Sequence, residues 1–148
     1  MRWLLDTNVL SEGIRSRPDP AVFNWMSSRK TQDVAISIVS VAELLAGAAS
    51  ALDRERRERL TQWIETEILS AVNRRVLPVT TEVLVVWLQL SRALRARGAP
   101  RDPADLLIAA TARVHGITLA TRNTRHFALT GIAVYNPWTD ETQQMEAP

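Results

Sequence analysis

Hydrophobic and polar positions alternate along the chain in blocks that predict strands and helices in turn. Short apolar or β-branched runs, bounded by polar or turn residues, predict five strands. They are Arg2–Leu5, Asp33–Ser37, Val76–Val79, Ile117–Ala120 and Ile132–Tyr135. Apolar residues at helical spacing predict six helices between them. The helices are Asp6–Gly13, Ala21–Ser28, Ser40–Ala49, Ala51 to about Val72, Thr80–Arg97 and Asp102–His115. This alternation is typical of an α/β domain with a mainly parallel sheet flanked by helices.

The two longest predicted helices each have a distinctive face. The helix from Ala51 carries apolar side chains on one side, beginning with Leu52. Its first turns alternate in charge, which predicts two exposed ion pairs four residues apart, Asp53 with Arg57 and Glu55 with Arg59. In the helix Thr80–Arg97, the side chains expected to point inward are Leu84, Trp87, Leu88 and Leu94.

The chain of 148 residues suits one domain with one core. We expect this domain to span 1–138 and a loose polar tail to follow at 139–148. In parallel α/β folds, ligands bind beyond the carboxyl ends of the strands. Asp6 directly follows the first predicted strand, and Thr121–Asn123 directly follow the fourth. Both are therefore predicted to lie on the functional edge of the sheet.

Composition excludes several kinds of site. The absence of cysteine rules out disulfides, thiolate zinc sites and a cysteine nucleophile. His115 and His126 are too few for a three-histidine zinc site. The chain has no GxGxxG or Gly-Lys-Ser/Thr phosphate loop and no GxSxG nucleophile elbow. Asp6 interrupts the apolar start before a signal peptide forms, and no run reaches the roughly 20 apolar residues of a membrane span. A cytoplasmic protein is expected.

The charge balance is mildly positive and depends on arginine. The net charge is +2, and Lys30 is the only lysine. Arginine suits phosphate recognition through its planar fork of donors. A genome that favours arginine explains the same composition, so charge alone does not establish a nucleic-acid partner.

Three carboxylates at predicted helix starts are candidates for chemistry, and each also has a structural interpretation. Asp6 fits a helix N-cap. Glu43 fits a capping box with Ser40, although its short helix is otherwise apolar. Asp105 fits the third position of a helix begun by Asp102, where it complements the helix dipole. That helix is nearly all apolar beyond its first turn, and a buried acid usually pairs with a cation or a metal.

The conjunction of these residues predicts a metal site. Asn123, beyond the fourth predicted strand, fits either this site or a turn with a left-handed backbone. Carboxylates gathered at one sheet edge form an oxygen-only ligand set that suits Mg²⁺ or Mn²⁺. Such an ion activates a bound water, neutralises charge on a phosphoryl group and offsets the repulsion between the carboxylates.

Five segments of the chain carry a resemblance to a known family. They are Leu4–Glu12, Ile36–Gly47, Ala104–Ala112, Leu119–Phe127 and Val134–Trp138. In this order they resemble the motifs of the PIN-domain ribonucleases, in particular the VapC-like toxins of bacterial toxin–antitoxin pairs. The last segment is similar to the end of the FitB-like branch. The resemblance implies a single PIN-like, Rossmann-like domain and a ribonuclease dependent on Mg²⁺ or Mn²⁺.

Carried over by position, the resemblance makes Asp6, Glu43 and Asp105 the metal ligands. Asn123 lies where many relatives have aspartate, which leaves a neutral ligand or water-positioning group and does not support a second tightly held metal. The residues expected to support the site or contact RNA are Thr7, Asn8, Thr121, Arg122 and Arg125. His126 lies close to Asn123 in the sequence, within reach of a substrate.

The resemblance also implies a homodimer and inhibition by a small antitoxin protein. The apolar face within Leu84–Leu94 is interpreted either as a docking groove for such a partner or as core. Two other functions stay open. One is a degenerate PIN-like binding module that acts through a protein partner, which Asn123 favours. The other is a different metal-dependent phosphoesterase.

Overall fold

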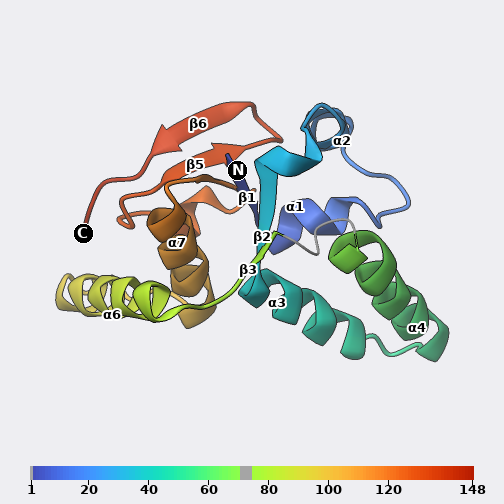
Figure 1. The fold of residues 1–148 in the computed structure, drawn as a ribbon, viewed down its shortest axis with the longest axis horizontal. Coiled ribbons are helices and arrows are strands. Elements are labelled where there is room, and N and C mark those ends of the chain that lie inside the picture. The colour runs from blue at the N-terminus through green and yellow to red at the C-terminus, as the bar shows by residue number, and fades with distance from the viewer. Residues whose placement is uncertain (1, 71–74) are drawn as a thin grey trace.

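A six-stranded sheet forms the centre of the molecule (Figure 1). The computed structural model describes residues 2–70 and 75–148. The strand order is β3-β2-β1-β4-β5-β6, in which β1 to β5 are parallel and β6 is antiparallel to β5. The bounds are β1 Trp3–Leu5, β2 Val34–Ser37, β3 Val76–Leu77, β4 Thr118–Ala120, β5 Ala133–Asn136 and β6 Glu141–Gln144. The predicted α/β fold with a mainly parallel sheet is confirmed.

Helices cover the two faces of the sheet. Figure 1 shows α6 and α7 together on one side, and α1, α3 and α4 on the other. The bounds are α1 Thr7–Glu12, α2 Pro20–Ser27, α3 Ile38–Ala49, α4 Arg54–Trp63, α6 Thr81–Ala96 and α7 Pro103–His115. A π-helical segment, Ile64–Leu69, continues α4, and short 3-10 helices lie at Thr31–Asp33 and Thr124–Phe127. None of the helices in the described part of the chain combines the length and apolar character that a membrane span requires.

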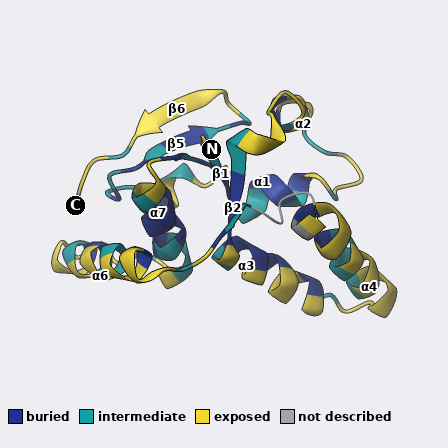
Figure 2. Cartoon of the chain, in the orientation of Figure 1, coloured by how far each residue is buried: buried dark blue, intermediate teal, exposed yellow. Residues whose placement is uncertain are grey.

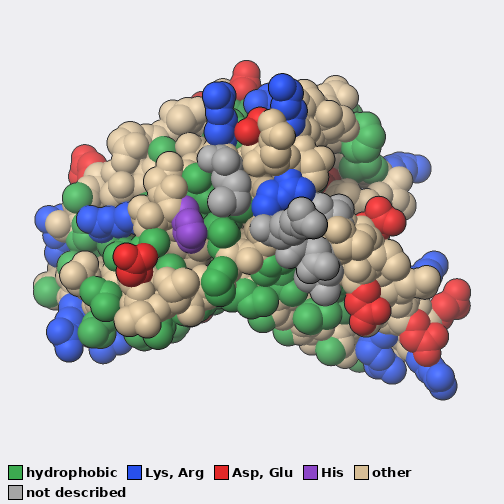
Figure 3. Space-filling model, in the orientation of Figure 1, with side chains coloured by type: hydrophobic (Ala, Val, Ile, Leu, Met, Phe, Trp, Pro, Cys, Tyr) green, Lys and Arg blue, Asp and Glu red, His purple; other side chains and the backbone are tan. Residues whose placement is uncertain are grey.

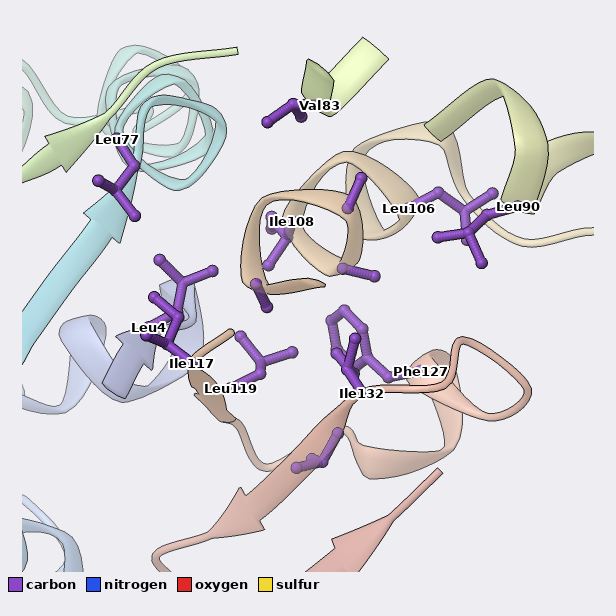
Figure 4. Packing of buried hydrophobic residues seen from close by; sticks show 14 of the residues in the cluster. Leu4, Leu77, Val83, Leu90, Leu106, Ile108, Ile117, Leu119, Phe127 and Ile132 are labelled. Atoms are coloured by element: carbon purple, nitrogen blue, oxygen red, sulfur yellow. The ribbon is translucent and has the colours of Figure 1, made fainter. Parts of the chain in front are cut away.

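Alternating side chains of the strands divide the core into two layers. Successive residues of a strand point to opposite faces of a sheet. Leu4 therefore packs with Ile108 and Phe127 beneath α6 and α7 (Figure 4). Leu5 packs with Val9 and other residues of α1, α2 and α3 on the opposite face. Figure 2 shows that buried residues are concentrated in the inner strands, including β1, β2 and β5, and in parts of the helices, whereas β6 is exposed.

The parallel register brings the candidate residues to one edge of the sheet. Leu5 of β1 lies opposite Ile36 of β2 and Ala120 of β4. The next residue, Asp6, donates its backbone N–H to the Ala120 carbonyl at 3.0 Å. The chain therefore leaves β1, β2 and β4 at neighbouring points, as the sequence predicts for Asp6 and Thr121.

The prediction that residues 139–148 form a loose tail is wrong, because β6 adds to the sheet beside β5 over Ala133–Asn136. The turn between the two strands places Asp140 at φ 57°. The Asp140 carboxylate also accepts a hydrogen bond from the Tyr135 hydroxyl at 2.8 Å. Polar side chains are compatible with this strand because it lies at the sheet edge, where all four of its residues are exposed.

The helix predicted over Ala51 to Val72 begins at Arg54, because Asp53 caps it instead of pairing within it. Leu52 consequently lies outside the helix and is 101% exposed, so the prediction that it belongs to the apolar side of this helix is wrong. Within the described part of this helix, the ion pair is Arg54 with Glu58 at 2.8 Å, not the pairs predicted. The predicted end at Val72 lies outside the described residues.

The buried face of α6 differs from the predicted one. Val83, Leu90 and Leu94 are buried, whereas Leu84 and Leu88 are 48% and 41% exposed. The expectation is thus confirmed for Leu94 and wrong for Leu84 and Leu88. Apolar residues extend around much of α6. Their spacing alone therefore does not identify the face that packs against α7.

Candidate active site

Asp6 occupies the point where β1 turns into α1, and it is 6% exposed. Its Oδ1 accepts the backbone N–H of Thr7 at 2.8 Å, so the predicted helix cap is present. Its Oδ2 accepts hydrogen bonds from Asn8 Nδ2 at 2.7 Å and from Thr121 Oγ1 at 2.5 Å. A cap requires only one of these three bonds. The other two hold the carboxylate in a fixed orientation at the sheet edge.

Thr121 connects β1 and β4 across this edge. Besides donating to Asp6, its hydroxyl accepts Asn8 Nδ2 at 3.1 Å and the Asn123 backbone N–H at 3.0 Å. Asn8 Oδ1 in turn accepts the backbone N–H of Arg122 at 3.1 Å. The structure therefore brings together Asn8 and Thr121 as hydrogen-bonding partners of Asp6.

Glu43 lies on α3 and faces α1. The helix begins at Ile38, and its N-cap is Ser37, whose hydroxyl accepts the Val39 N–H at 3.2 Å. Glu43 is therefore in the second turn, and the predicted capping box with Ser40 does not form. Instead, Glu43 Oε2 accepts a 2.5 Å hydrogen bond from the Thr7 hydroxyl. This contact joins α3 to α1.

Asp105 lies in the first turn of α7, behind the N-cap Asp102 and Pro103, as predicted. Its side chain is 21% exposed, and its Oδ2 lies 3.0 Å from Nδ1 of His126 in the 3-10 helix after β4. From its position in the sequence, His126 was expected to lie within reach of a substrate, and its contact with Asp105 was not predicted. The only signal was its position three residues after Asn123, which does not reveal contact with a residue on a different helix.

Asn123 and Arg122 lie at the exposed end of β4. Asn123 has φ −92°, so the left-handed turn conformation considered from the sequence is wrong. Its side chain makes no hydrogen bond to the described residues and is free to face a ligand. The Arg122 guanidinium lies 5.5 Å from the ring centre of Trp138, a cation–π contact.

The pKa of each of the three carboxyl groups is raised above its ordinary value, mainly because each is partly or wholly buried. Burial is the main cause for Asp6, and the hydrogen bonds from Thr121, the Thr7 amide and Asn8 offset part of this rise in pKa. Burial also raises the pKa of Glu43, and the charges of Asp6 and Asp105 raise it further. These interactions require the acids of three separate elements to share one region of the molecule.

The pKa of Asp105 is raised by burial, lowered by His126, and raised again by the charges of Asp102 and Asp6. A group of acids with raised pKa values suits a cation, which removes the repulsion between them. In the part of the chain that the structure describes, no three acidic or histidine side chains lie close enough to enclose a metal ion. The oxygen donors nevertheless match ions that retain part of their water shell, such as Mg²⁺.

Comparison with known proteins identifies the family. The sequence profile of the PIN domain matches residues 3–132. This chain belongs to the PIN-domain family. Toxin FitB of Neisseria gonorrhoeae is 39% identical over 137 residues, which cover 93% of this chain and 99% of FitB. VapC ribonuclease Y4jK of Sinorhizobium fredii is 36% identical over 135 residues, which cover 91% and 96% of the two chains.

A solved structure agrees with the sequence comparison. The FitAcB crystal structure from Neisseria gonorrhoeae matches this PIN domain with a TM-score of 0.86 and 38% identity, and the match covers 92% of this chain and 98% of that chain. The predicted relationship to VapC- and FitB-type toxins is therefore confirmed, as is the PIN-like architecture.

Proposed function

We propose that this PIN domain is a metal-dependent endoribonuclease and the toxin of a toxin–antitoxin pair that acts in the cytoplasm. The observation that carries the proposal is the convergence of Asp6, Glu43 and Asp105 from β1, α3 and α7 on one edge of the sheet. The similarity to toxin FitB and to VapC ribonuclease Y4jK supports the same activity.

In this proposal, Asp6, Glu43 and Asp105 hold Mg²⁺ or Mn²⁺, directly or through water. Glu43 and Asp105 each keep one oxygen for an ion, since the described residues make no hydrogen bond to Glu43 Oε1 or Asp105 Oδ1. When bound, the ion supplies an acidified water and neutralises charge on the phosphoryl oxygens. Asn123 contributes a neutral amide, which supports one tightly held metal more than two.

The remaining residues fix the ligands and face the RNA. Asn8 and Thr121 hold Asp6 in a single orientation, while Thr7 positions Glu43. Arg122 is exposed beside the carboxylates and suits a backbone phosphate, so its contribution should weaken as salt increases. Removal of a residue that hydrogen-bonds to a metal ligand typically lowers metal affinity or activity about 10- to 100-fold.

The test is cleavage of a mixed structured RNA pool by purified protein in Mn²⁺, in Mg²⁺ and in EDTA. Asp6→Asn serves as the inactive comparison. We expect cleavage that requires metal and disappears in the variant. Parallel reactions with DNA and an aryl phosphate test the alternative of another phosphoesterase. Equal turnover of those substrates would overturn the assignment to RNA.

Asn123 favours a second candidate, a binding module that has lost turnover. Restoring aspartate distinguishes the two functions. If the wild-type protein neither cleaves RNA nor binds metal by calorimetry, while Asn123→Asp gains metal binding, the degenerate module is supported. Cleavage by the wild-type protein excludes it.

Exposed apolar side chains support the proposed partners, a second copy of the chain and an antitoxin. Leu84, Val85 and Leu88 on α6 and Ile38 and Leu45 on α3 are each about 40–50% exposed. Figure 3 shows hydrophobic side chains on both sides of the hollow between these helices. Sedimentation analysis of the wild type and of a variant carrying Leu84→Glu and Leu88→Glu tests the homodimer. A monomeric wild type would contradict it.

A further inference from the structure

The active-site edge opens into a cavity of about 470 Å³ between α1, α3 and α4. Thr7, Asn8 and Glu43 are among its lining residues, so the cavity adjoins the acidic site at Glu43. Its volume is within the usual range for ligand pockets, about 300–1,000 Å³. Binding of a metal ion by the carboxylates does not require a cavity of this size. The residues that line the cavity therefore indicate which part of a substrate it could bind.

The walls of this cavity combine arginines with tryptophans. Arg15, Arg56, Arg122, Trp63 and Trp138 all line it. The Arg122 guanidinium stacks over the Trp138 ring at 5.5 Å. The Trp63 ring lies against the end of α1, since a methyl group built on Gly13 would come within 3.3 Å of Trp63 Cζ2. Both tryptophans are only half-buried and present part of a ring to the cavity.

Three arginines and two glutamates line this cavity among apolar side chains, so its walls carry a small excess of positive charge. Arg15 is paired with Glu12 at 2.7 Å, which neutralises one of the arginines. Arg56 and Arg122 form no ion pair with the described residues. Glu43 is the other acid on the walls, and it belongs to the metal-binding end. The outer part of the cavity is therefore suited to an anion that extends away from the carboxylates.

A second cavity, of about 620 Å³, continues this groove along α4. It shares Arg15 and Arg56 with the first and adds Arg59. Arginines therefore recur along the groove from the sheet edge to the outer side of α4, with the tryptophans close to the acidic end. Aromatic rings that stack bases, combined with a basic track for phosphates, are the recognition pattern of single-stranded nucleic acid.

We propose that this groove binds the single-stranded RNA on one side of the scissile phosphodiester. Trp63 and Trp138 stack the bases nearest the carboxylates, and Arg56 and Arg59 of α4 contact the phosphates beyond them. The inference rests on the proposed ribonuclease function, whose acidic site sets the position of the cleaved bond. An apolar small molecule fits less well, because it leaves Arg56 and Arg59 without a partner.

The test measures binding of a fluorescein-labelled single-stranded RNA by anisotropy, with the full chain made inactive by Asp6→Asn. Arg56→Gln and Arg59→Gln are each expected to weaken binding and to reduce the slope of log Kd against log salt by about 0.7, the value for one phosphate contact on a single strand. Arg54→Gln is the matched control. Arg54 lies on the same helix, is exposed, pairs with Glu58 and lines neither cavity.

Trp63 is tested separately because it also packs against α1. Trp63→Leu is expected to weaken RNA binding about 5- to 150-fold, the range for loss of one base–aromatic stack. Trp63→Phe keeps a ring and should recover most of the affinity. Equal loss in the two variants would show that Trp63 acts through packing and would contradict stacking.

The outcomes separate this proposal from the ribonuclease function. If the wild type cleaves RNA but the Arg56 and Arg59 variants bind RNA and cleave it like Arg54→Gln, the groove is not the RNA path and the proposal is overturned. If those variants lose only affinity for a protein partner, it is overturned as well. If the wild type does not cleave RNA but its RNA binding depends on Arg56 and Arg59, the proposal that the groove binds RNA is supported. In that case only the assignment of ribonuclease activity is rejected.

Discussion

Replacing Thr121 with valine removes one hydroxyl from the centre of the site while preserving the shape of the side chain. Thr121 is fully buried, and its hydroxyl contacts Asp6 Oδ2, Asn8 Nδ2 and the Asn123 amide. The bond to the Asp6 carboxylate, at 2.5 Å, matters most. A hydrogen bond to a charged group contributes about 1.5–3 kcal/mol. Water can replace the bond to Asn123, which is exposed, and Asn8 keeps its bond to Asp6. We therefore expect Thr121→Val to lower the free energy of unfolding by about 1.5–3 kcal/mol.

The effect on activity follows from the loss of the same bond. Without the Thr121 hydroxyl, the pKa of Asp6 rises further, because that hydrogen bond is the largest of the contributions that lower it. Protons then compete more effectively with the metal. We expect the Mg²⁺ concentration for half-maximal cleavage to rise about 10- to 100-fold, with most of the rate recovered at saturating Mg²⁺.

The assay is cleavage of a fluorescent RNA across a Mg²⁺ titration, together with urea unfolding in EDTA. Thr111→Val is the matched control, because Thr111 is equally buried and donates only to the Leu107 carbonyl within α7. It should change neither the Mg²⁺ midpoint nor the maximal rate. A Thr121→Val protein with an unchanged Mg²⁺ midpoint would refute the reasoning that this hydroxyl holds Asp6 for metal binding.

Three further predictions concern the carboxylates. Asp6→Asn is expected to abolish cleavage even at saturating Mg²⁺, with an unchanged circular dichroism spectrum; residual turnover comparable to wild type would contradict its role. Because the pKa values of Asp6, Glu43 and Asp105 are raised, cleavage should fall at a higher pH than the value of about 4 for ordinary carboxylates. Added Mg²⁺ should move this midpoint to lower pH, and a midpoint independent of Mg²⁺ would count against metal binding by these groups. In EDTA, Glu43→Gln should raise the free energy of unfolding by less than about 1 kcal/mol near neutral pH and leave it unchanged near pH 4. The free energy of unfolding rises at neutral pH because an acid with a raised folded-state pKa loses its stabilising contribution as the pH rises through that pKa. A gain in the free energy of unfolding of equal size at both pH values, measured by urea denaturation, would exclude this explanation.

Sequence patterns predicted the sheet because its strands are buried on both faces and read as short apolar runs. The order and approximate positions of β1, β2, β4 and β5 follow from those runs alone. The edge strand β6 was not predictable in this way, since Glu141–Gln144 carry only polar side chains. Its formation depends on the free edge of β5 and on the turn at Asp140, which are tertiary features.

The candidate site shows the same division between local and long-range information. Asp6 and Asp105 were found from strand exits and helix starts, which are local signals. Their contacts with Thr121 and His126 span 115 and 21 residues, and no spacing rule gives such pairs. Glu43 lies in the second turn of α3, and the capping box predicted for it does not form, because α3 starts two residues earlier than predicted.

The three carboxylates differ in how firmly they are held by the residues around them. Asp6 is buried and accepts three hydrogen bonds, so its orientation is fixed by β1, α1 and β4 together. Glu43 and Asp105 are more exposed, and each is positioned by one side chain from another element, Thr7 or His126. A cation bound by these acids would offset the repulsion between their charges. Asp6 is therefore the fixed ligand of the proposed site, while Glu43 and Asp105 are free to adjust to the ion and to the RNA beside it.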